Sequence, residues 1–117
     1  MKVLIIDDEA DICFLLTALL KKKNVEAKFV NTLSDAEVAL STQVPEIIFL
    51  DNYLPDGLGL NFIGFIKHRY PKSKIIMITA HDTIADRQKA LTLGADCFIC
   101  KPFNKEVIFK ALDKLTN

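Results

Sequence analysis

Five short apolar runs alternate with longer segments of helical period along this chain. The runs span residues 3–6, 25–30, 47–50, 75–78 and 97–100. Residues 75–78 are apolar at successive positions, which is typical of a parallel strand that is buried on both faces. The alternation therefore predicts an α/β fold, a doubly wound five-stranded parallel sheet with helices on both faces.

Apolar residues at helical spacing predict amphipathic helices between the strands. The segment after Asp8 and the last segment have apolar positions at i, i+3, i+4 and so on: Ile12, Leu15, Leu16, Leu19, Leu20, and Val107, Ile108, Ala111, Leu112, Leu115. Asn104 is the expected N-cap of the last helix, and Gly94 the expected stop of the preceding one. That preceding helix, residues 82–93, has the poorest apolar face.

Length and charge limit what the chain can be. With 117 residues and 50% hydrophobic content, residues 1–117 are expected to form one domain with one core. Fifteen basic and fifteen acidic residues give a net charge of zero, which provides no general attraction to nucleic acid or an anionic membrane. The first apolar run ends at Asp7, too early for a signal peptide, and no later run has membrane-spanning length. We expect a cytoplasmic protein.

Three cysteines leave a redox or metal pair open as an alternative, because Cys97 and Cys100 form a C-x-x-C motif. On a strand, an offset of three places the two side chains on opposite faces with Cα atoms about 10 Å apart, beyond disulfide reach. Buried, reduced thiols are therefore expected at Cys13, Cys97 and Cys100.

Charged and polar residues follow four of the predicted strands. Asp7 and Asp8 follow the first run and Asp51 the third, while Thr79 follows the fourth and Lys101 the fifth. In a parallel sheet these ends meet at the carboxyl edge, where ligands of doubly wound folds bind. An alternative for Asp7 and Asp8 alone is that they cap the first helix, where its dipole favours negative charge.

The carboxylates at this edge are expected to hold a divalent metal. Three carboxylates within about 5 Å repel each other by about 3 kcal/mol per ionised pair at an effective dielectric of about 20, so they need a cation. Oxygen ligands favour Mg²⁺, with Mn²⁺ possible. Asp51 is exposed by the turn at 52–59 and can act as a nucleophile on a phosphoryl group. Lys101 and the metal would offset charge on the phosphoryl oxygens, and the Thr79 hydroxyl would donate to one of them.

Together the motifs Asp7-Asp8-Glu9, Asp51 with Leu54-Pro55 and Gly59, Thr79-Ala80, and Phe98 with Lys101-Pro102-Phe103 resemble the response-regulator receiver domain of two-component signalling. The resemblance covers essentially the whole chain. It implies the flavodoxin-like strand order 2-1-3-4-5 and transfer of a phosphoryl group from a histidine kinase or phosphotransfer protein to Asp51.

The resemblance also implies which residues bind the metal and what the protein does in signalling. Asp8, Asp51 and the main-chain carbonyl of Tyr53 would hold Mg²⁺, with Asp7 acting largely through water. The protein would be a signalling phosphoacceptor that promotes its own phosphorylation and dephosphorylation, rather than an enzyme. It would act on an unknown effector, without direct binding of nucleic acid or membrane, and could form a homodimer on phosphorylation.

The resemblance further implies a switch in which Thr79 moves toward the phosphoryl group and the Phe98 ring turns into the vacated space. Because this ring lacks a hydroxyl, packing should bias the two states. A cis peptide bond is expected between Lys101 and Pro102. We also form the hypothesis that Tyr53 and His81, each two residues after a site residue, restrict attack by water; the alternative is that both side chains simply face solvent.

Two apolar residues lie off the predicted core faces of their helices. Phe14 on the first helix is expected to face solvent and to help dock the phosphodonor. Phe109 on the last helix is similarly expected to lie off the core face, near the surface that receivers use for outputs. Scattered exposed apolar residues are common, so a role without docking stays open for both.

Three other classes share part of this pattern. A magnesium-dependent phosphatase with an Asp nucleophile of the haloacid type needs a second Asp two residues on, where this chain has Tyr53. A flavodoxin-like redox carrier needs a phosphate loop after the first strand, where Asp7-Asp8-Glu9 would repel phosphate. A non-phosphorylated interaction module of the same fold is disfavoured because every required residue is present. No effector follows the last helix, so the chain is expected to be a stand-alone receiver or a piece of a longer regulator.

Overall fold

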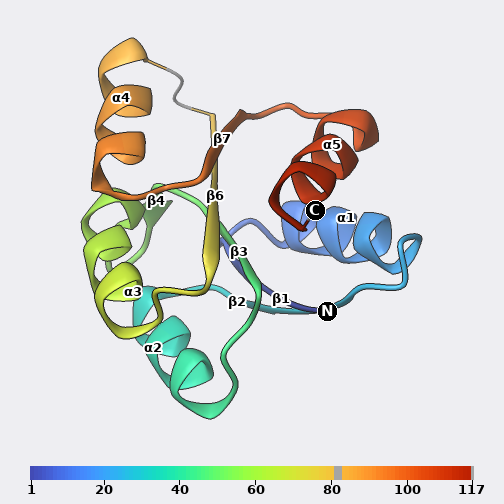
Figure 1. Cartoon of the computed structure of the whole chain (residues 1–117), viewed down its shortest axis with the longest axis horizontal. Helices are drawn as coiled ribbons and strands as arrows, with labels where there is room; N and C mark the ends of the chain where they lie inside the picture. The colour runs from blue at the N-terminus through green and yellow to red at the C-terminus, as the bar shows by residue number, and fades with distance from the viewer. Residues whose placement is uncertain (81–82, 117) are drawn as a thin grey trace.

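The computed structural model describes residues 1–80 and 83–116 and contains a five-stranded sheet in the order β2-β1-β3-β6-β7 (Figure 1). All neighbouring strands are parallel. The strands are β1 Lys2–Ile6, β2 Glu26–Val30, β3 Ile47–Leu50, β6 Lys74–Thr79 and β7 Cys97–Cys100. Counted along the chain, these are the five predicted strands, so the predicted order 2-1-3-4-5 is confirmed.

Five helices cover the two faces of the sheet. They are α1 Ala10–Lys21, α2 Leu33–Thr42, α3 Ile63–Arg69, α4 Ile84–Leu93 and α5 Lys105–Thr116. Helices α1 and α5 lie on one face and α2, α3 and α4 on the other (Figure 1). Alternate side chains of a strand point to opposite faces of the sheet. In β1, Val3 and Ile5 pack toward α1 and α5, whereas Leu4 and Ile6 pack toward the other three helices. The predicted doubly wound architecture is therefore confirmed.

The predicted helix boundaries have the expected chemistry. Asn104 Oδ1 accepts a hydrogen bond from the Val107 N–H at 3.0 Å, which confirms it as the cap of α5. Gly94 ends α4 with a φ of 118°, which favours glycine. Within the described part of α4 only Ala90 is buried, in agreement with its poor apolar face; residue Asp82, where this helix was expected to begin, lies outside the described residues.

The predicted core stripes of α1 and α5 were too wide. Leu15 is 46% exposed and Val107 is 42% exposed, although both were expected in the core. Each helix packs against a single sheet face, so residues at the margin of the stripe stay at the surface. Phe14 is 62% exposed, as predicted, and its ring contacts that of Phe29 edge-on with centroids 5.8 Å apart. Phe109 was placed wrongly, because it is half-buried and packs against the α1 and α5 core.

The three thiols are free, as predicted. Their burial is only partly as expected. Cys13 is fully buried, whereas Cys97 and Cys100 are half-buried, because β7 lies at the edge of the sheet. The prediction of buried thiols is therefore wrong for this pair.

A small hairpin follows β3, where the sequence predicted only a turn. Its strands are β4 Tyr53–Leu54 and β5 Gly57–Leu58, and a 3₁₀ turn, η1 Gly59–Phe62, leads into α3. The hairpin lies beside the carboxyl edge of the sheet and so frames the predicted site.

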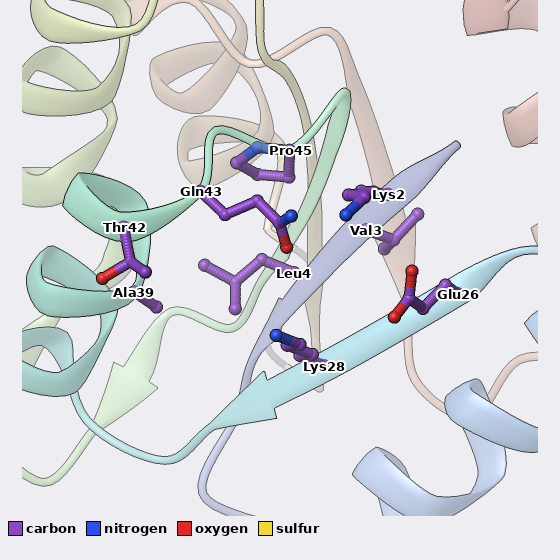
Figure 2. Close-up of a pocket in the computed structure, with 9 residues that line it drawn as sticks. All are labelled: Lys2, Val3, Leu4, Glu26, Lys28, Ala39, Thr42, Gln43 and Pro45. Carbon is purple, nitrogen blue, oxygen red and sulfur yellow. The ribbon is translucent and has the colours of Figure 1, made fainter.

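A hollow of about 190 Å³ lies at the amino edge of the sheet, on the side away from the strand ends that precede Asp7 and Asp51 (Figure 2). Figure 2 shows Leu4 between strand β2 and the end of α2, with the Gln43 side chain extending over it. This hollow is remote from the strand ends that carry Asp51. Among the described residues, no helix is long and apolar enough to cross a membrane.

Candidate functional site

The carboxyl ends of β1 and β3 bring three predicted carboxylates together. One carboxylate oxygen each from Asp7, Asp8 and Asp51 lies within 4.8 Å of the others. Asp7 and Asp51 are buried and Asp8 is exposed. The expectation that the turn after β3 exposes Asp51 is therefore wrong, because this residue is only 4% exposed beside Lys101 and Asp7. They adjoin an open hollow of about 250 Å³, which is lined by Asp8, Glu9, Asp51, Tyr53, Thr79, Ala80 and Lys101. The structure thus places every predicted catalytic and metal-binding residue at one site.

Lys101 reaches into this cluster from the end of β7. Its Nζ lies 2.9 Å from Asp7 Oδ2 and 3.5 Å from Asp51 Oδ2. It also donates to Glu9 Oε1 at 2.9 Å. The Lys101–Pro102 peptide bond is cis, as predicted. The strand-end pattern assigns Glu9 no role of its own, because its contact with Lys101 depends on how the chain turns after β1.

Burial and crowding shift the acid-base behaviour of the site. Burial, followed by the nearby Asp7 carboxylate, raises the pKa of Asp51 to about 6, against the opposing effect of Lys101. Burial also raises the pKa of Asp7. For Lys101, burial lowers the pKa, but the bonds to Glu9 and Asp7 and the charge of Asp51 outweigh it, so the net shift is upward and the ammonium stays charged. A cation is therefore already favoured at this cluster.

Backbone hydrogen bonds fix the position of Asp51. Its N–H donates to the Ile6 carbonyl at 2.9 Å, and its Oδ1 accepts from the Asn52 N–H at 2.8 Å. The buried Asn52 in turn accepts from the Leu60 N–H through Oδ1 at 3.0 Å and from the Gly59 N–H through its carbonyl at 2.7 Å. A Cβ at Gly59 would lie 2.1 Å from the Asp51 carbonyl oxygen, so only glycine fits this position.

The two carboxylate oxygens of Asp7 have different partners. Oδ1 accepts from the Glu9 N–H at 2.9 Å, and the Asp7 carbonyl accepts from the Asn31 side chain at 2.8 Å. Oδ2 is buried and, among the described residues, has no hydrogen-bond donor of good geometry; its compensation is the ion pair with Lys101. A buried carboxylate oxygen in this situation, beside two further carboxylates, fits the needs of a hard divalent cation.

The remaining predicted residues surround the acidic cluster. Thr79 is buried at the end of β6, and its carbonyl accepts from the Lys101 N–H at 2.8 Å. Phe98 on β7 is half-buried, with the Arg87 guanidinium carbon 4.9 Å from its ring centroid. Tyr53 is 45% exposed at the mouth of the hollow. His81, which was paired with Tyr53 in the hypothesis on water access, lies outside the described residues.

The comparisons with known proteins agree with this geometry. The family model of the response regulator receiver domain matches residues 3–113. The response regulator protein PilR of Pseudomonas aeruginosa is 32% identical over 115 residues, which cover 95% of this chain and 26% of that protein. The regulatory protein VanR of Enterococcus faecium is 38% identical over 104 residues, covering 87% of this chain and 44% of that protein. The chain thus spans about a quarter to a half of the length of these relatives.

Among solved structures, the beryllofluoride-activated NtrC4 receiver domain dimer is similar with a TM-score of 0.93 and 36% identity, and the match covers 97% of this chain and 94% of that one. The family match includes the residues of the acidic hollow and the five strands of the sheet except for Lys2 at the start of β1. This chain belongs to the response regulator receiver domain family.

Proposed function

We propose that residues 1–117 form a receiver domain that accepts a phosphoryl group on Asp51. The observation that carries this proposal is the position of Asp51 Oδ2, within ion-pair distance of Lys101 and next to Asp7 and Asp8 in an open hollow. A nucleophilic carboxylate, a fixed ammonium and a metal-binding group are the parts that phosphoryl transfer requires.

The proposed reaction takes the phosphoryl group from a phosphohistidine of a sensor kinase or phosphotransfer protein. Asp51 Oδ2 attacks the phosphorus, a P–O bond forms, the P–N bond breaks, and the imidazole leaves with its electron pair and takes up a proton. Lys101 would neutralise negative charge on the phosphoryl oxygens, and the Thr79 hydroxyl would donate to one of them. In this proposal the protein is a signalling phosphoacceptor that promotes its own phosphorylation and dephosphorylation.

We propose Mg²⁺, with Mn²⁺ as an alternative, as the metal of this site. Asp8, Asp51 and the carbonyl of Tyr53 would hold it, with Asp7 acting through water. The buried Asp7 Oδ2 and the clustered carboxylates support this choice. When bound, the metal supplies positive charge for the phosphoryl oxygens.

Thr79 and Phe98 are the proposed switch. Thr79 would move toward the phosphoryl group, and the Phe98 ring, half-buried and beside Arg87, would turn inward. Because Phe98 carries no hydroxyl, the inward ring needs no hydrogen-bond partner, and packing would set the balance.

The partners follow from the same proposal. They are a histidine kinase or phosphotransfer protein and an effector of unknown type, with no direct binding of nucleic acid or membrane, in the cytoplasm. We also propose a homodimer on phosphorylation, in line with the beryllofluoride-activated dimer of the similar NtrC4 receiver domain.

Incubation with Mg²⁺ and acetyl phosphate followed by intact-mass measurement tests the function directly. We expect the parent protein to gain one phosphoryl group and the Asp51→Asn variant to gain none. Phosphorylation that persists in Asp51→Asn would refute the assignment of the acceptor. An unmodified parent protein would instead favour the interaction module without phosphorylation.

A further inference from the structure

The hairpin beside the phosphoacceptor is fastened to a helix by one exposed carboxylate. Asp56, at the turn between β4 and β5, accepts a hydrogen bond from the Leu33 N–H through Oδ1 at 2.9 Å. Its second oxygen, Oδ2, accepts from the Ser34 N–H at 3.0 Å. Leu33 and Ser34 are the first two residues of α2, whose backbone donors have no partner within the helix.

These bonds are not the helix's own cap. Thr32 already caps α2, since its side chain accepts from the Asp35 N–H at 3.0 Å. Asp56 therefore adds a contact from a distant loop, 22 to 23 residues away in sequence. The two hydrogen bonds lower the pKa of the Asp56 carboxyl, as expected for a carboxylate that receives N–H donors at the positive end of a helix.

A second contact lies next to the first. Gly57 has a φ of 153°, and a Cβ at this position would lie 3.1 Å from Leu33 Cδ1, so the tip of the hairpin packs closely on the start of α2. The side chain of Leu33 itself packs against the core layer that includes Leu54 of β4. The hairpin is therefore held on its outer side by α2.

The other side of the hairpin reaches the acidic hollow. Tyr53, which pairs with Leu58 across the hairpin, lines that hollow together with Asp51. Directly before and after the hairpin, Asn52 and Gly59 are joined by the 2.7 Å bond from the Gly59 N–H to the Asn52 carbonyl. A shift of the hairpin would therefore move the Tyr53 backbone relative to the Asp51 carboxylate.

We infer that Asp56 is a positioning residue for the metal site: by tying the hairpin to the first two N–H groups of α2, it fixes the Tyr53 backbone at the acidic hollow. This inference rests on the proposed function, because it concerns the Tyr53 carbonyl as a ligand. Linkage requires the converse effect as well, so a cation bound at the hollow steadies the contact between the hairpin and α2.

The test is a titration of the parent protein and Asp56→Ala with Mg²⁺. Calorimetry measures the dissociation constant, and amide hydrogen exchange measures the contact between the hairpin and α2. We expect the Mg²⁺ dissociation constant to rise about fivefold, less than the loss of a direct outer-sphere partner produces. The Leu33 and Ser34 amides should exchange faster, and Mg²⁺ should slow their exchange in the parent protein but not in Asp56→Ala.

The matched control is Asp35→Ala, which removes one negative charge from the first turn of α2, close to the N–H groups that Asp56 contacts, while leaving Asp56 in place. Its dissociation constant should stay within about twofold of the parent value, because only the screened helix-dipole contribution changes. Asp56→Asn, which keeps the shape and one acceptor oxygen, should fall between the parent and Asp56→Ala, and it decides the matter if Asp56→Ala does not fold.

Two results would overturn the inference. Equal Mg²⁺ affinity in the parent and the Asp56 variants would refute the positioning role while leaving the proposed function intact. A parent protein that binds no Mg²⁺ but is otherwise folded would overturn both the inference and the metal assignment. Labelling of Asp51 in the parent protein by acetyl phosphate tests the proposed function by itself, because this experiment uses no Asp56 variant.

Discussion

Lys101 Nζ lies 3.5 Å from Asp51 Oδ2, and the two residues follow strands β7 and β3, which are separated in the sheet by β6. The same ammonium is 2.9 Å from Asp7 Oδ2, so one cation compensates two buried carboxylates. The Lys101 ammonium therefore lies between two buried carboxylates, where a positive charge is favoured. A divalent metal bound at the hollow would have to share the Asp7 and Asp51 carboxylates with this ammonium.

Lys101→Ala should separate metal binding from phosphoryl transfer. Removing the ammonium leaves Asp7 and Asp51 without their cation, so Mg²⁺ affinity should increase several-fold, about 1 kcal/mol in binding free energy. Phosphorylation by acetyl phosphate should nevertheless slow about 100-fold, because a fixed donor to the developing charge is lost. Calorimetric Mg²⁺ titration and mass-spectrometric initial rates measure the two effects.

Lys105→Ala is the control for this prediction, since Lys105 is exposed at the start of α5 and its loss changes the same charge. Both Mg²⁺ affinity and the rate should stay near the parent values. A Lys101→Ala protein with weaker Mg²⁺ binding would contradict the view that the ammonium and the metal compete for the same carboxylates.

The raised pKa of Asp51 predicts a pH-dependent stability in the absence of metal. A carboxyl whose pKa is higher in the folded chain than in the unfolded chain holds its proton more tightly when folded, so protonation favours folding. For Asp51 the two values are about 6 and the usual 3.8. The free energy of unfolding should therefore fall as the pH rises from about 4 to about 6, and the destabilisation should persist above that window.

Asp51→Asn should remove most of this penalty. At pH 7.5 with EDTA, we expect the variant to be more stable than the parent by on the order of 2 kcal/mol, because no charge is buried at position 51 and Lys101 keeps Asp7 and Glu9 as partners. At pH 4 the difference should largely disappear, and saturating Mg²⁺ should restore the parent. Urea unfolding under the three conditions measures it, and a less stable variant at pH 7.5 would contradict the sign.

The fold and most of the site could be predicted because each depends on short-range pattern. Runs such as residues 47–50 and 75–78 mark buried parallel strands, and the carboxyl ends of such strands necessarily share one edge. The positions of Asp51 and Lys101 followed from that rule alone. The same rule has no information on Glu9, whose contact with Lys101 depends on how the chain turns after β1.

The errors arise where tertiary packing decides. Helical periodicity identifies the faces of α1 and α5 but not how wide the covered stripe is, so Leu15 and Val107 were expected in the core and are exposed. Likewise the contact of Asp56 with α2 joins residues 22 to 23 positions apart, which no local pattern specifies.

Gly59 should be far more sensitive to substitution than Gly64. Gly59→Ala would place a Cβ 2.1 Å from the Asp51 carbonyl oxygen, so the backbone must shift, at a cost of about 3 kcal/mol, with weaker Mg²⁺ binding. Gly64 lies exposed in α3 and a Cβ there meets nothing within 4 Å, so Gly64→Ala should stabilise the protein by about 0.5–1 kcal/mol. Thermal and urea unfolding of the two variants test this pair, and equal effects would refute the packing argument.

Arg87 and Phe98 should be energetically coupled across α4 and β7. The guanidinium carbon of Arg87 lies 4.9 Å from the Phe98 ring centroid, a distance at which the ring face attracts a cation. Since Arg87 has other interactions, a single variant cannot isolate this one, and a double-mutant cycle of Arg87→Gln and Phe98→Leu is required. We expect a coupling free energy of about 0.5–1 kcal/mol in the unphosphorylated protein.

Phosphorylation should reduce this coupling, because an inward Phe98 ring leaves Arg87. The cycle is therefore measured again with beryllofluoride and Mg²⁺, which mimic the phosphoryl group at Asp51. A coupling free energy near zero in this state, with the first value retained in its absence, would show that the ring moves. The same coupling in both states would place Phe98 outside the switch and leave Thr79 as its only proposed member.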